Sequence, residues 1–108
     1  MKLFDAHHHF WDLTRNYHPW LCDDPQIPFR YGNYQAIREN YLPQDYDRDS
    51  CGFDIAGSVY VEAEWDPEDP VGEVRWVDEV STRCAHPVLI VAQAQLDHAD
   101  IDEILAQH

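Results

Sequence analysis

The chain has 108 residues, of which 21 are acidic and 7 are Lys or Arg, so its formal net charge is −14. Hydrophobic residues make up 44% of the sequence and aromatic residues 13%, which is too apolar for a disordered acidic tail and typical of a small folded domain. The negative charge opposes polyanions, so it argues against nucleic acids and anionic membrane surfaces as partners. No apolar run approaches the roughly 18 residues of a membrane span, and the cysteines form no CxxC pair, so we expect a cytoplasmic protein.

Residues 2–9 (KLFDAHHH) have the length and composition of a short strand. Because side chains alternate along a strand, Asp5, His7 and His9 are expected to share one face with Leu3. Three ionisable side chains on one face are unusual for a core strand. The sequence therefore predicts that this strand carries functional groups.

Residues 10–42 show neither a helical nor a strand period. Loops of this length are rare in compact domains unless they form lids or binding loops. We expect a loop that is packed by its own aromatic residues, with a short helical turn near residues 35–40, and this loop is also a candidate lid. Its aromatic residues are Trp11, Tyr17, Trp20, Phe29, Tyr31, Tyr34 and Tyr41.

Five further elements are expected after this loop. In the expected helix that begins near Asp69, Val77 and Val80 belong to an apolar stripe, and Glu73 lies outside it. The last helix begins with Asp100 and Glu103, which resemble a capping pair. The expected elements are a helix from Pro43 toward Cys51, a strand over 56–63, a helix with Asp69 as N-cap and Pro70 at its first position that ends near His86, a strand over 88–96, and a helix from about 101.

The alternation of strands and helices predicts an α/β fold with a parallel sheet. In each strand the polar residues lie toward the carboxyl end of one face, which is the pattern of a closed barrel with a site at its mouth. An open doubly wound sheet would bury apolar residues on both faces. We therefore predict the N-terminal βαβαβα portion of a (β/α)8 TIM barrel, with residues 1–108 forming a single partial domain.

His7 and His9 are the strongest functional candidates. Two positions apart on a strand, they project from the same face about 6–7 Å apart and can converge on one ion. Neutral imidazoles suit divalent metals, zinc first among them, and a metal-free site is the alternative. The competing hypothesis is structural, in which all three histidines serve as hydrogen-bonding groups in a partly polar core.

Four other residues are candidates for contacts at this site. Glu62 and Glu64 follow the second strand and could contact the ion or the substrate, although a solvated pair is the competing interpretation. Trp11 and Arg30 come from the aromatic loop and are candidate substrate contacts. An arginine there could hold a substrate carboxylate or form an ordinary salt bridge. Asp5 is a candidate for orienting a histidine.

The segments FDAHHHFWDL, YLPQDY, GSVYVEAEWDP and VLIVAQAQLD resemble the start of the amidohydrolase-related (amidohydrolase 2) TIM-barrel hydrolases, most of all their lactonase branch. The resemblance implies that His7 and His9 bind a divalent metal or, in branches without metal, the substrate. It implies hydrolysis of a small sugar or organic-acid lactone, with metal-assisted decarboxylation as the alternative. The implied partner is thus a small-molecule carboxylate or lactone.

The family's later histidines and its catalytic aspartate have no counterpart in this sequence. A complete barrel takes about 250 residues, and three of its eight units would leave sheet edges unpaired. We therefore expect a truncated product or the N-terminal portion of a longer one, with little hydrolase activity of its own. A non-catalytic fragment or subunit that self-associates or binds a partner through these edges is the third hypothesis.

Overall fold

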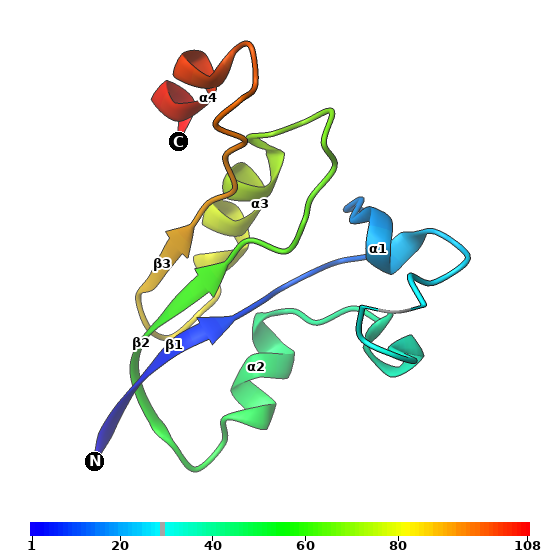
Figure 1. Ribbon diagram of the computed structural model, residues 1–108. Coiled ribbons are helices and arrows are strands. Elements are labelled where there is room, and N and C mark those ends of the chain that lie inside the picture. The colour runs from blue at the N-terminus through cyan, green and yellow to red at the C-terminus, as the bar shows by residue number, and fades with distance from the viewer. Residues whose placement is uncertain (29) are drawn as a thin grey trace.

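The computed structural model describes residues 1–28 and 30–108, so Phe29 of the aromatic loop lies outside the described residues. Three parallel strands form one sheet in the order β1-β2-β3 (Figure 1). Within the described ranges, no helix is long and apolar enough to cross a membrane. The elements are β1 (Lys2–His8), α1 (Pro19–Cys22), the 3-10 turn η1 (Gln35–Ile37), α2 (Pro43–Asp49), β2 (Asp54–Val61), α3 (Gly72–Ser81), β3 (Val88–Val91) and α4 (Ile101–Gln107).

The main hydrophobic core lies between the sheet and the two helices α2 and α3. Tyr46 of α2 and Val77 of α3 are buried against Tyr60 of β2, so both helices cover the same face of the sheet (Figure 1). The opposite face is open, and Leu89 and Val91 of β3 are 63% and 50% exposed there. The α/β class and the parallel sheet agree with the expectation, whereas closure into a barrel and association through the strand edges stay predictions.

The pairing of β1 with β2 is not a regular ladder. Asp5 pairs with Ser58 and His8 pairs with Tyr60, so β1 uses three steps where β2 uses two. Ser58 and Tyr60 are two apart and share a face, which places Asp5 and His8 together on the side of the helices. The expected grouping of Asp5 with His7 is therefore wrong, because the extra residue reverses the alternation between them.

Glu73 occupies a buried position that the helical pattern did not predict. Its carboxylate accepts a hydrogen bond from the Tyr60 hydroxyl at 2.6 Å and one from the Ala63 backbone N–H at 2.8 Å. The residue is 4% exposed, and burial raises the pKa of its carboxyl above the ordinary range despite these two donors. Glu73 thus connects α3 to the segment that follows β2.

The first turn of α3 begins later than expected. The helix starts at Gly72 with Val71 as N-cap, and Asp69 and Pro70 lie in the preceding turns. A side chain at Gly72 would collide with the Asp69 carboxylate, and its Cβ would lie 2.7 Å from Nε1 of Trp65. The turn packs against the helix start too closely for Asp69 to act as its cap.

The third strand and the last helix also differ from the expectation. Strand β3 ends at Val91, because the last ladder bond runs from the Glu62 N–H to the Val91 carbonyl and β2 continues no further. Helix α4 begins at Ile101, as expected, and Asp100 is its N-cap. The side chain of Asp100 makes no capping hydrogen bond, so the predicted capping pair with Glu103 does not form.

Replacing Glu73 by Gln should flatten the pH dependence of stability. The native carboxyl has a raised pKa, so as the pH rises from about 4.5 the unfolded chain releases this proton before the folded chain does. That difference lowers the free energy of unfolding until the pH passes the native pKa. Urea unfolding of both proteins between about pH 4.5 and neutrality measures it. Parallel stability profiles for wild type and Glu73→Gln would contradict the assignment.

Candidate active site beyond the carboxyl ends of β1 and β2

A cleft of about 640 Å³ opens where β1 and β2 end. We call it the aromatic cleft. It includes five of the six residues expected from the sequence to contact the ion or the substrate, and Arg30, the sixth, bonds to one of them. Its lining residues are His7, His9, Trp11, Trp20, Tyr31, Asn33, Tyr34, Ala36, Ile37, Val61, Glu62, Ala63 and Glu64.

His7 and His9 converge at the base of this cleft. Their Nε2 atoms are 3.2 Å apart, and Nδ1 of His9 lies 2.8 Å from the Val61 carbonyl oxygen. That carbonyl can only accept, so Nδ1 of His9 carries the proton and its Nε2 presents a lone pair. Burial, with the neighbouring His7 adding to it, lowers the pKa of His9. At neutral pH the ring is thus uncharged and its free nitrogen faces His7.

The spacing of these two nitrogens suits a shared ion. Two imidazole nitrogens bound to one tetrahedral zinc at about 2.0–2.1 Å are about 3.3 Å apart. The observed 3.2 Å between Nε2 of His7 and Nε2 of His9 matches this geometry. Across residues 1–28 and 30–108, however, no three His, Cys, Asp or Glu side chains gather as a metal site. His7 and His9 therefore fit as two ligands of a metal site that requires a third protein ligand.

His8 points to the other side of the sheet and is held in the core. Its Nε2 lies 2.9 Å from Oγ of Ser58, and the same Oγ lies 2.9 Å from Nε2 of His86. A serine hydroxyl has one proton, so it donates to one imidazole and accepts from the other. Burial lowers the pKa of His8 to about 4, so this ring is neutral at physiological pH. The bonded His8 fixes the backbone between the two cleft histidines.

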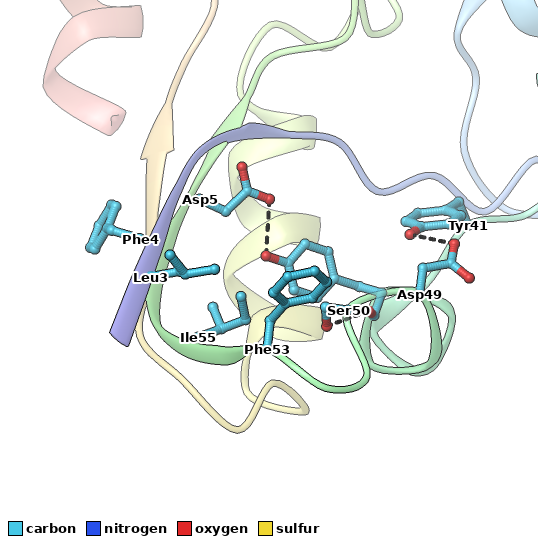
Figure 2. A pocket seen from close by; sticks show the side chains of 9 residues that line it. Leu3, Phe4, Asp5, Tyr41, Asp49, Ser50, Phe53 and Ile55 are labelled. Carbon is cyan, nitrogen blue, oxygen red and sulfur yellow. Dashed lines mark hydrogen bonds between the residues drawn. The ribbon is translucent and has the colours of Figure 1, made fainter. Parts of the chain in front are cut away.

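Among the described residues, the hydrogen bonds of Asp5 go to the main chain of the site and to a tyrosine hydroxyl, and not to an imidazole ring. One carboxylate oxygen accepts from the His7 backbone N–H at 3.1 Å, and the other accepts from the Tyr46 hydroxyl at 2.9 Å. Figure 2 shows Asp5 directed toward α2 and Phe4 pointing away from it. Asp5 was expected to orient a histidine side chain, but its hydrogen bond is with the backbone N–H of His7, so it positions the main chain of that residue.

The aromatic loop is tied to the sheet through the main chain of Ala63. The Ala63 carbonyl accepts from Nδ1 of His18 and from Nε1 of Trp20, both at 2.9 Å. A second tie joins Trp11 to Tyr41 through two backbone hydrogen bonds of 2.9 Å. No pattern in the sequence indicates a role for His18, because a lone histidine in a loop has no spacing that marks it. It is fully buried and supports the cleft from behind.

Aromatic side chains form the walls of the cleft. The Trp11 ring stacks on the His9 ring with centroids 5.9 Å apart and planes at 17°. Trp20 contacts Tyr31 and Tyr34 at centroid distances of 5.5 and 5.6 Å. Such walls bind flat rings or the apolar faces of sugars, and the histidines provide polar atoms at one end.

Glu62, Glu64 and Arg30 form a chain of polar contacts at the rim. The Glu62 carboxylate accepts the Glu64 backbone N–H at 2.8 Å, and Nη1 of Arg30 donates to both Glu64 oxygens at 2.8 and 2.7 Å. Glu64 has a φ of 55°, a left-handed conformation that costs about 1–3 kcal/mol for residues with a side chain. Both glutamates are engaged here, and neither completes a metal site with the histidines.

A second cavity, of about 430 Å³, lies between β1 and α2 and is shown in Figure 2. Its two carboxylates are bound by tyrosine hydroxyls, Asp5 by Tyr46 at 2.9 Å and Asp49 by Tyr41 at 3.0 Å. Its lining contains no histidine, cysteine or cationic side chain. We therefore place the candidate active site in the aromatic cleft.

No protein-family model matches the chain. Uncharacterized protein y4mH of Sinorhizobium fredii is 34% identical over 108 residues, which are 100% of this chain and 36% of that protein. Amidohydrolase 2 from Bifidobacterium longum subsp. infantis aligns with a TM-score of 0.58 and 20% identity, covering 89% of this chain and 34% of the other. The chain thus spans about a third of the length of these proteins, and its fold is amidohydrolase-like. Assignment to the lactonase branch stays a prediction.

Removing the Ser58 hydroxyl should destabilise the protein, because it leaves the His8 and His86 nitrogens without this partner. We expect Ser58→Ala to lower the free energy of unfolding by about 1–3 kcal/mol. Ser81→Ala is the matched control, since the buried Ser81 hydroxyl makes no hydrogen bond to any described residue and its loss should have little effect. Urea unfolding of the two variants makes the comparison, and equal effects would show that the His8–Ser58 contact contributes nothing specific.

Proposed function

We propose that this chain contributes part of the active site of a metal-assisted hydrolase that opens a small lactone. The observation that carries the proposal is the pair of imidazole nitrogens, His7 Nε2 and His9 Nε2, 3.2 Å apart at the carboxyl end of β1. The carbonyl of Val61 sets the tautomer of His9, as outer hydrogen bonds do for metal-binding histidines. The amidohydrolase-like fold supports the reaction class.

A divalent ion at this pair would supply a water of lowered pKa for attack on the ester carbonyl. His7 and His9 would hold the ion, and zinc suits these ligands best. A third protein ligand and a group that accepts the water's proton would come from outside the described residues. The walls formed by Trp11 and Trp20 would hold the lactone ring beside the histidines and exclude bulk water.

Metal binding is the first test. With cobalt(II) as a spectroscopic probe or zinc in calorimetry, we expect His7→Ala and His9→Ala each to lower the affinity by at least about tenfold, because each removes one of two ligands. His98→Ala is the matched control, since His98 lies outside the aromatic cleft. If the His98 variant lost as much affinity as the other two, the ion would not be bound at the proposed pair.

Activity is the second test, made on the natural gene product that carries this chain. Release of acid from a panel of sugar and organic-acid lactones, followed with a pH indicator, should fall by at least about 100-fold in kcat/KM for His9→Ala. Release of carbon dioxide in place of a ring-opened acid would assign the protein to decarboxylation instead. Full retention of kcat/KM in His9→Ala would end the assignment of this site.

A further inference from the structure

Arg30 is the cationic side chain that reaches the aromatic cleft. It bonds to Glu64, which lines the cleft, and its guanidinium lies 5.6 Å from the centre of the Tyr31 ring. The other ion pairs of the described residues join Arg38, Arg48 and Arg75 to aspartates, and none of these residues lines the cleft. Lys and Arg number only 7 in this chain against 21 acidic residues, so an arginine beside the cleft is a candidate for a specific role.

The ion pair between Arg30 and Glu64 lacks the features of a tightly held pair, so another anion could replace Glu64. A strong arginine–carboxylate pair uses two nitrogens in parallel, whereas here Nη1 alone donates to both oxygens of Glu64. The two side chains are 40% and 44% exposed, so water competes with the pair. Glu64 holds its place in a left-handed conformation with φ 55°, which residues with a side chain adopt rarely. Neither electrostatics nor backbone preference fixes this contact firmly.

We propose that Arg30 recognises a carboxylate on a ring-shaped ligand and that Glu64 occupies the guanidinium until that ligand binds. This inference rests on the proposed function, since it takes the aromatic cleft as the substrate site. The ligand's carboxylate would replace Glu64 on Arg30, and its ring would lie against Tyr31 and Trp20. Glu64 then acts as an internal competitor that discriminates against neutral ligands, because they cannot replace it.

A cationic ligand is the main alternative, since aromatic walls with nearby carboxylates also bind cations. The contacts of the cleft argue against it. The Glu64 carboxylate is neutralised by Arg30, and that of Glu62 is engaged by the Glu64 backbone N–H. A cation that drew Glu64 away would leave Arg30 without its partner beside a second positive charge. An anion that replaces Glu64 on Arg30 releases a carboxylate that is 44% exposed and that water can solvate.

The test compares benzoate with benzamide, a neutral molecule of nearly the same shape, in the presence of a chelator. Quenching of tryptophan fluorescence should show wild type binding benzoate at least tenfold more tightly than benzamide. Arg30→Gln should abolish this preference, and Glu64→Gln should tighten benzoate binding several-fold by releasing the guanidinium. Arg48→Gln, an exposed arginine variant on α2 outside the cleft, should behave as wild type.

Three results would overturn the inference: no preference for benzoate in wild type, an unchanged preference in Arg30→Gln, or weaker benzoate binding in Glu64→Gln. Tighter binding of phenyltrimethylammonium than of benzoate would assign the cleft to cations. Circular dichroism and urea unfolding verify that each variant is folded. Because the assay needs neither metal nor turnover, its failure leaves the hydrolase proposal standing, and failure of lactone hydrolysis leaves the benzoate result standing.

Discussion

The irregular pairing of β1 with β2 determines where the histidines of this protein lie. With strict alternation His7 and His9 would share a face with Asp5, which lies on the side of the helices. The extra residue between Asp5 and His8 reverses that order, so the two outer histidines reach the cleft and the middle one enters the core. A bulge disrupts the local ladder, and the bonds of His8 to Ser58 and of Asp5 to the His7 N–H offset that loss.

The walls of the cleft depend on a second constraint, the satisfaction of the main chain at Ala63. Its N–H donates to the buried Glu73, and its carbonyl accepts from His18 and Trp20. A buried peptide group needs such partners, because no water is available to replace them. The same three side chains join α3 and the aromatic loop to the end of β2. The cleft is thus assembled by hydrogen bonds to one residue as much as by the packing of its aromatic rings.

The sequence was sufficient for the parts of this structure that depend on periodic patterns. The three strands, the parallel sheet and the helix from Pro43 follow from alternation, from an apolar run and from proline placement, although β3 ends five residues earlier than its apolar run predicts. Position in the strand also brought His7 and His9 together as candidates. The bulge could not be predicted, because inserting one residue into a strand changes the pairing without changing the composition. For the same reason strict alternation groups Asp5 with His7 and His9, which the structure separates from it.

The burial of single polar residues is the second feature that could not be predicted from the sequence. The helical pattern places Glu73 outside the apolar stripe, and only its position behind the end of β2 makes it a hydrogen-bond acceptor for Tyr60 and Ala63. His18 and Ser58 were overlooked for a related reason: each acts through a partner at least 28 positions away in the sequence. Long-range hydrogen bonds carry no local pattern, so a single sequence does not reveal them.

Electrostatics connects these features to the chemistry of the cleft. A chain of formal charge −14 attracts divalent cations, but the same field favours protonated imidazoles, which cannot bind a metal. At His9 burial outweighs the nearby Glu62 carboxylate, so its pKa falls and the ring stays neutral. The stacked Trp11 ring covers one face of His9, and the Val61 carbonyl holds the proton on Nδ1. The aromatic loop therefore does more than shape the cleft, because covering His9 keeps its lone pair free for an ion in an otherwise acidic protein.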